Sequence, residues 1–195
     1  MTFPNTTVVG AADVHYNGAG GATAALVVCN ELAFATVIAE HVTSIIHVAP
    51  YESGALFKRE LPCIQAVLAL SDPLQLLVVD GYATLDPDGR PGLGAHVAAA
   101  FNLPVIGVAK TPFRTATHAI RVVRGTATRP LYVTAAGDIE IDEAARIVAA
   151  MVGPHRVPAA LARADRLARN HAEPDSDIST PGAVEALKRK MRSTR

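Results

Sequence analysis

The feature that most limits how this 195-residue chain can fold is one short, continuous apolar run. Residues 74–79 are interrupted only by Gln75, and the run stops abruptly at Asp80-Gly81. A run of this length that is rich in Leu and Val is typical of a central strand buried on both faces. It is far too short to cross a membrane. The run therefore favours a sheet with helices packed on it.

The rest of the chain predicts an antiparallel meander followed by alternating strands and helices. A glycine-rich turn at 17–21 separates the first two strands, which indicates a hairpin. We expect strands at 8–16, 22–29, 34–48 (interrupted around 40–44), 74–79, 105–108, 121–124 and 130–134, and helices at about 57–68, 93–101, 141–151 and 158–169. This order predicts an α/β fold with a mixed β-sheet flanked by helices.

Composition agrees with one globular domain. Half of the residues are hydrophobic and there is no Trp, so the core must consist mostly of Ala, Val, Leu and Ile. We expect one domain at 1–171 and a flexible or helical basic tail at 172–195. The start of the chain has no secretory signal pattern, which favours the cytoplasm. There Cys29 and Cys63 would be reduced and buried, with a disulfide as the alternative.

The net charge is zero, with 18 basic and 18 acidic residues. This balance disfavours a protein that coats nucleic acid non-specifically, because such binding depends on neutralising phosphates. It leaves open an enzyme that grips a short stretch of strand with a local basic patch. Five basic residues near the end of the chain are read either as a solvated helix end or as a phosphate-binding arm.

Two aspartates occupy strand positions at which a binding site is expected. Asp13 follows small residues in the first strand, and Asp80 ends the most buried strand. Ligands bind at such strand ends, because side chains there project into a crevice. A carboxylate beside an apolar strand is costly unless a cation compensates for its charge, and converging carboxylates suit Mg²⁺. A turn or capping role is the alternative for Asp80.

Two further acids lie on predicted helices. Glu60 is early in its helix, where an acid also stabilises the helix dipole. Asp165 lies beside the buried face of the last helix, where an ion pair with Arg169 is the simpler interpretation. Each acid has an ordinary explanation when it is considered alone.

Taken in order, these segments resemble the endonuclease V family. The matching segments are 10–14 (Gly-Ala-Ala-Asp-Val), 50–62, 79–81, 92–96, 104–110 (Pro-Val-Ile-Gly-Val-Ala-Lys), 129–133 and 156–167. The resemblance covers about residues 8–169 and implies a ribonuclease H-like fold. It identifies the chain as a short variant that lacks the family's leading helix.

The resemblance also implies an activity. Family members nick strands at the second phosphodiester bond 3′ to deoxyinosine, leaving 3′-hydroxyl and 5′-phosphate ends, in DNA repair. Asp13 and Asp80 would hold Mg²⁺, for which Mn²⁺ can substitute. Glu60 and Asp165 would complete the catalytic site, by binding a second ion or by orienting the attacking water. Lys110 would stabilise phosphate charge.

The same resemblance implies how the lesion is recognised. Tyr51 matches a wedge residue that fills the space left by an extruded base, and Gly54, Leu56 and Gly81 match the pocket for that base. An ordinary loop aromatic is the alternative for Tyr51. The chain departs from the family at Ser53, where a second proline is usual, and at Asp86, where a histidine is usual.

Several alternatives remain open at this point. The substrate is DNA containing deoxyinosine or, alternatively, single-stranded RNA containing inosine. A non-catalytic nucleic-acid-binding relative and a phosphatase for small nucleotides are other classes. We expect a monomer that has no membrane partner.

Overall fold

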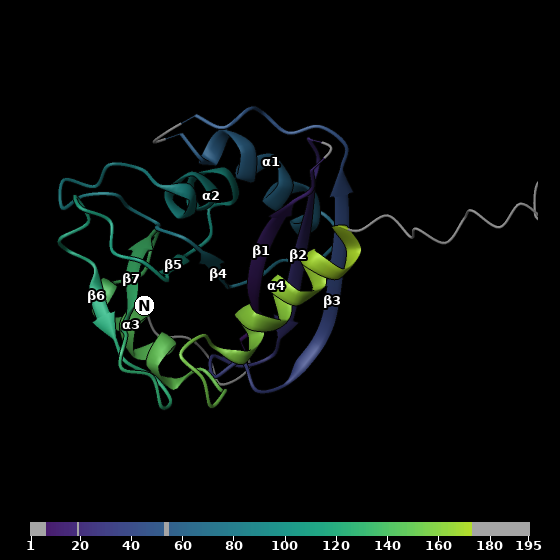
Figure 1. The fold of residues 1–195 in the computed structure, drawn as a ribbon. Coiled ribbons are helices and arrows are strands. Elements are labelled where there is room, and N and C mark those ends of the chain that lie inside the picture. The colour runs from purple at the N-terminus through teal and green to yellow at the C-terminus, as the bar shows by residue number, and fades with distance from the viewer. Residues whose placement is uncertain (1–6, 19, 53–54, 173–195) are drawn as a thin grey trace, which may run out of the picture.

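The computed structural model describes residues 7–18, 20–52 and 55–172. Its strands are β1 (Val9–Tyr16), β2 (Ala22–Cys29), β3 (Val37–Ile45), β4 (Leu76–Asp80), β5 (Val105–Ala109), β6 (Ile120–Val122) and β7 (Leu131–Ala136). Its helices are α1 (Phe57–Leu68), α2 (Leu93–Phe101), α3 (Ile141–Ala150) and α4 (Ala159–Ala172). In this part of the chain the strands form one sheet in the order β3-β2-β1-β4-β5-β7-β6 (Figure 1). The central strands β1, β4 and β5 are parallel, and the outer pairings are antiparallel.

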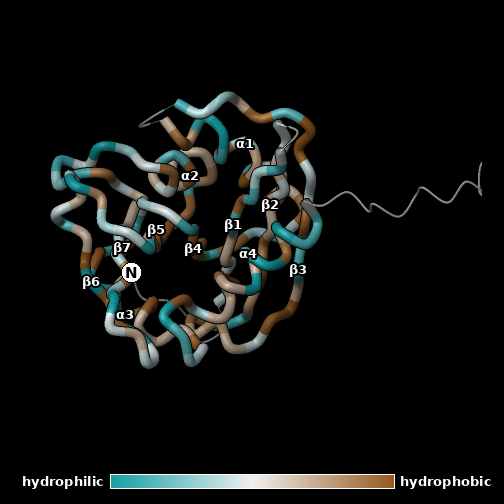
Figure 2. Tube along the Cα trace, in the orientation of Figure 1, coloured by the Kyte–Doolittle hydropathy of each residue, from teal (hydrophilic) through white to brown (hydrophobic). Residues whose placement is uncertain are grey.

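Helices cover both faces of the sheet, which explains why its central strands are continuously apolar. α3 and α4 pack on one face, where Ala11 and Val78 point, and α1 and α2 pack on the other, where Ala12 and Val79 point. Successive residues of a strand point to opposite faces, so neighbouring residues belong to different cores. Figure 2 shows hydrophobic residues along β4 and β5 in the middle of the molecule. The prediction of a buried central strand is confirmed, although the strand begins at Leu76, later than the predicted start at residue 74, and ends at Asp80.

The predicted interruption of the third strand is wrong. β3 is continuous through the predicted interruption and pairs with β2 there, including Glu40 and Ser44; the register shifts only near its start, at Ile38. Among the described residues β3 is an edge strand, and Ile38, Glu40 and Ser44 are exposed on it. Backbone hydrogen bonds to β2 hold the strand, so its polar side chains break the apolar pattern without breaking the strand.

The predicted strand at 121–124 also ends earlier than expected, at Val122. Arg124 turns inward and is buried, and it donates hydrogen bonds to backbone carbonyls of the segment that joins α3 to α4. The sequence alone does not show that the strand ends before Arg124. The end becomes clear only from the distant carbonyl groups that Arg124 contacts.

The remaining expectations concern the cysteines, the membrane and the tail. Cys29 and Cys63 are free and buried, one in each core, so the interpretation as reduced thiols is confirmed and the disulfide is not formed. Within the described ranges, no helix has the length and apolar character needed to span a bilayer. α4 continues to Ala172, and the predicted basic tail beyond it lies outside the described residues.

Candidate active site

The parallel pairing of β1 with β4 places Asp13 beside Asp80. The register aligns Ala12 with Val79, so the two aspartates come next on neighbouring strands. Strand alternation turns both side chains toward the face that α4 covers, the side of Ala11 and Val78. Asp13 therefore lies inside β1, and Asp80 lies at the carboxyl end of β4.

α4 supplies the third acid. Burial, then the negative charge of Asp80, and then a hydrogen bond with Asp165 raise the pKa of Asp13 to about 7. Asp165 accepts a hydrogen bond from Arg169 Nε at 2.9 Å, which lowers the pKa of Asp165. Asp165 thus makes the ion pair that its helix spacing predicts, and it also faces Asp13.

Lys110 follows β5 and joins the aspartates directly. Its ammonium group donates a hydrogen bond to Asp80 Oδ2. Burial would lower the pKa of Lys110, but this hydrogen bond and the charges of Asp80, Asp13 and Asp165 raise it overall. Lys110 therefore does not simply extend into solvent from the end of its strand.

Glu60 reaches the same region from the other face of the sheet. It lies on α1 and is only 9% exposed, and Tyr16 donates a hydrogen bond to Glu60 Oε1 at 3.2 Å. Burial raises the pKa of Glu60 to about 7, and the charges of Asp13 and Asp80 act in the same direction. The Arg59 guanidinium lies 4.0 Å from the centre of the Tyr16 ring. Acids from four elements, β1, α1, β4 and α4, thus lie close enough for their charges to act on Asp13 and Glu60.

These acids offer oxygen ligands of the kind that Mg²⁺ prefers. Within 7–18, 20–52 and 55–172, however, no three His, Cys, Asp or Glu side chains are arranged to hold a metal ion as they stand. Burial first, and then the charges of neighbouring acids, raise the pKa values of Asp13 and Glu60, while Lys110 is the cation that Asp80 contacts.

A cavity of about 490 Å³ adjoins one of the four acids, Glu60. Glu60 and Gly81 line it, so it adjoins both Glu60 and the end of β4. The structure also brings Tyr51 and Leu56 to this cavity, and the Tyr51 side chain is 69% exposed. Gly54 lies outside the described residues. The positions matched to a wedge and a base pocket therefore share one cavity wherever the structure describes them.

Sequence reasoning missed two aromatic residues of this cavity, Tyr82 and Phe113. Their ring centres are 5.8 Å apart. The Tyr82 hydroxyl accepts a hydrogen bond from the Phe113 backbone N–H at 2.9 Å and donates one to the Thr111 carbonyl at 2.8 Å. Tyr82 thereby fixes the loop after Lys110 so that Phe113 faces the cavity. Aromatic residues that follow so closely after Asp80 and Lys110 are the signal that would have found them.

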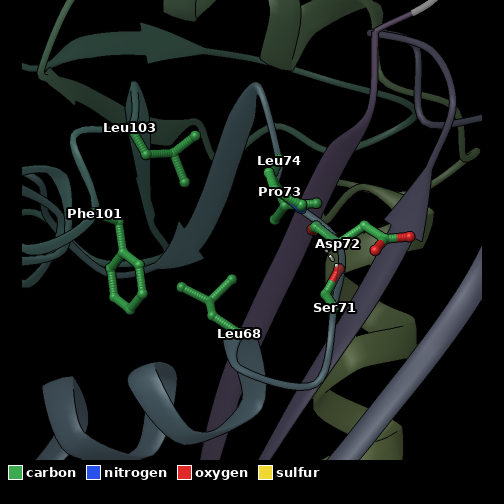
Figure 3. A pocket seen from close by; sticks show the side chains of 7 residues that line it. All are labelled: Leu68, Ser71, Asp72, Pro73, Leu74, Phe101 and Leu103. Atoms are coloured by element: carbon green, nitrogen blue, oxygen red, sulfur yellow. Dashed lines mark hydrogen bonds between the residues drawn. The ribbon is translucent and has the colours of Figure 1, made fainter.

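A second cavity lies at the opposite end of β4, away from the acids (Figure 3). It measures about 250 Å³ and is lined by Leu68, Ser71, Asp72, Pro73, Leu74, Phe101 and Leu103. The Ser71 hydroxyl is occupied by a hydrogen bond to the Asp72 carbonyl. The lining residues include an acid, Asp72, and no basic side chain.

Known proteins match this chain in both sequence and fold. A model of the Endonuclease V family matches residues 2–127. Endonuclease V of Streptomyces avermitilis is 32% identical over 187 residues, spanning 85% of this chain and 81% of that protein. The crystal structure of the Endonuclease V from Streptomyces avermitilis has a TM-score of 0.73 at 28% identity and covers 86% of this chain and 82% of that chain.

A third match agrees in fold. Endonuclease V of Ciona intestinalis, in complex with a 24mer DNA containing an inosine followed by a ribo-adenosine, has a TM-score of 0.73 at 20% identity and covers 85% of this chain and 86% of that chain. The mixed sheet with flanking helices matches these structures, so the predicted ribonuclease H-like fold class is confirmed. By sequence along most of its length, the chain belongs to the endonuclease V family of nucleases.

Proposed function

We propose that this chain is a magnesium-dependent endonuclease that nicks DNA at the second phosphodiester bond 3′ to deoxyinosine, as a repair enzyme. The observation that carries the proposal is the convergence of four acids and Lys110 beside a cavity with aromatic and apolar walls. The inosine-containing DNA bound to the Ciona intestinalis relative supports the same substrate class for this chain. Nothing in a purely binding protein requires acids at the position of a phosphate.

The acids fit a divalent cation by their chemistry. Asp13 and Asp80 supply carboxylate oxygens from neighbouring strands, and desolvation makes the ionised form of Asp13 costly unless a cation compensates for its charge. In this proposal they hold Mg²⁺, with Mn²⁺ able to replace it. When bound, the ion lowers the pKa of the attacking water and neutralises charge that develops on the phosphate.

The protein's own groups then orient the substrate. Lys110 turns its ammonium from Asp80 toward a non-bridging phosphate oxygen, which places positive charge where the transition state is most negative. Tyr16 holds Glu60 through Oε1, so Oε2 of Glu60 accepts the hydrogen bond of the attacking water. Asp165, which is held by Arg169, closes the site from α4. Glu60 and Asp165 could alternatively bind a second ion.

Recognition of the lesion follows from the cavity. A mismatched base costs little to unstack, and an extruded base can enter a pocket beside the catalytic groups. Tyr51 would stack in the vacated space, and base–aromatic stacking contributes about 1–3 kcal/mol per base. Gly81, at φ +136°, leaves backbone groups accessible to the base edge, with Leu56 and Gly54 completing the pocket.

The test is a nicking assay on matched oligonucleotides. One duplex carries a single deoxyinosine, a second carries adenine at that position, and a single-stranded RNA carries inosine. Wild-type protein should nick the deoxyinosine strand with Mg²⁺ and not with EDTA. Asp80→Ala should lose this activity, and Asp72→Ala, an exposed acid far from the site, should keep it.

Each outcome of this assay distinguishes the proposed function from one alternative. Faster cleavage of the inosine RNA would assign the enzyme to RNA instead of DNA. Binding of all three substrates with cleavage of none would identify a non-catalytic relative. Nicking that persists in Asp80→Ala would refute the proposed site. Equal cleavage of a duplex substrate by Tyr51→Ala would remove Tyr51 from lesion recognition.

A further inference from the structure

A buried arginine holds the segment that joins α3 to α4, residues 151–158, through hydrogen bonds to its backbone. Arg124 is 6% exposed and donates hydrogen bonds to the carbonyl oxygens of Met151, His155 at 3.2 Å and Arg156 at 3.4 Å. A buried guanidinium is very costly to leave unpaired, so Arg124 and these carbonyls hold each other in place.

The backbone next to Arg124 is packed against the same segment. A Cβ atom at Gly125, whose φ is +56°, would lie 2.1 Å from the Pro154 carbonyl oxygen. The two backbones therefore touch, and the segment has no room to move toward β6. Residues 151–158 form a fixed support and not a loose connection.

Arg156 extends from this support to the active site. One of its terminal nitrogens donates hydrogen bonds to the Lys110 carbonyl and, at 2.6 Å, to the Pro130 carbonyl. Its Nε atom is buried and has no hydrogen-bond partner in the described part of the chain. The guanidinium thus lies packed between the ends of two neighbouring strands, β5 and β7, instead of facing solvent.

We propose that Arg156 is a positioning residue that acts through Lys110. By fixing the Lys110 backbone it holds the Lys110 ammonium against Asp80 and in reach of substrate phosphate. A lysine side chain is long and flexible, so the place of its ammonium depends on how firmly its backbone is anchored. The catalytic part of this inference rests on the proposed function, whereas the structural part does not.

The structural part can be tested without activity. The chain contains four lysines, Lys58, Lys110, Lys188 and Lys190, so ¹³C reductive methylation gives few lysine signals in an NMR spectrum. Asp80→Asn marks the position of the Lys110 signal when its ion pair is lost. Arg156→Met should move the Lys110 signal toward that position, and Arg156→Lys, which retains a donor nitrogen, should move it less.

An exposed arginine on α3 provides the matched control. Arg146→Met should leave the Lys110 signal unchanged. Melting curves show which variants are folded, and Arg156→Lys keeps the test decisive if Arg156→Met does not fold. A Lys110 signal at its wild-type position in folded variants of Arg156 would overturn the proposal.

Kinetics separate positioning from a general structural effect. On the deoxyinosine duplex, Arg156→Met should lower kcat on the order of ten- to a hundredfold with little change in KM. In a Lys110→Met background the same substitution should have almost no further effect. Equal losses in both backgrounds would overturn the proposal. A wild-type protein that nicks nothing would instead refute the proposed function, and the NMR comparison would still decide the role of Arg156.

Discussion

Replacing Asp13 by Asn should make the metal-free protein more stable at pH 8, although the variant should be inactive. Asp13 is partly buried near Asp80 and Asp165, so desolvation and their negative charges disfavour its ionised form. The Asn amide can donate the hydrogen bond that protonated Asp13 makes with Asp165, and it carries no charge. A residue selected for catalysis would thus reduce the stability of the fold that contains it.

The magnitude follows from the pKa of Asp13, which burial first, and then the charge of Asp80, raise from 3.8 to about 7. The unfolded chain loses this proton near the ordinary pKa, whereas the folded chain keeps it until near neutral pH. The stability that protonated Asp13 contributes is therefore fully present below the ordinary pKa of the residue. It is lost as pH rises through the pKa of Asp13 in the folded protein. At about 1.4 kcal/mol for each pH unit, and allowing for partial exposure, ionised Asp13 costs roughly 2–4 kcal/mol at pH 8.

Urea unfolding in EDTA measures this cost. With a slope of about 2 kcal/mol per molar urea, Asp13→Asn should raise the unfolding midpoint by about 1–2 M at pH 8, and by less at pH 5. Asp72→Asn removes an exposed acid outside the site and should change neither midpoint. Excess Mg²⁺ should stabilise the wild-type protein more than the variant. An Asp13→Asn midpoint at or below that of the wild type at pH 8 would refute the reasoning.

Three further predictions concern other parts of the molecule. Tyr82→Phe removes the hydroxyl that orders the cavity loop, so KM for the deoxyinosine duplex should rise about three- to tenfold while kcat changes little, and an unchanged KM would speak against that role. Glu40→Gln removes the paired hydrogen bonds from Arg163, which lower the pKa of Glu40, so it should cost about 0.2–1 kcal/mol of unfolding free energy at pH 7. That difference should begin to shrink as pH falls through 4.5 and vanish below the lowered pKa of Glu40 in the folded protein, and its persistence in strong acid would contradict the assignment. Burial raises the pKa of Cys29 and of Cys63 to about 11, so neither thiol should react with Ellman's reagent at pH 8 until guanidinium unfolds the protein, and rapid labelling of the native protein would show exposed thiols.

The central strand and its terminal acid could be predicted from sequence because both signals are local. An apolar run that stops at Asp80 places that residue at a strand end, and the small residues before Asp13 place it in the first strand. The sequence does not contain the register that makes Asp13 and Asp80 neighbours. Their proximity was expected only because both residues match one family.

The supports of the site were not predictable, because they join segments that are distant in the chain. Arg156 and the Lys110 carbonyl are 46 residues apart, and Tyr82 and Phe113 are 31 apart. The periodic pattern of hydrophobic residues in a sequence gives no information about such distant pairs. The uninterrupted β3 was missed for a related reason, since pairing with β2 decides the strand and Glu40 only obscures its pattern.

The position of the nick tests the proposed function most directly. A 5′-labelled duplex with a single deoxyinosine would be incubated with the protein and Mg²⁺, and the product would be sized against a ladder. We predict one product that ends in a 3′-hydroxyl at the second phosphodiester bond 3′ to the lesion, absent from the adenine duplex and from Asp80→Ala. Cleavage at another bond, or equal cleavage of the adenine duplex, would contradict it.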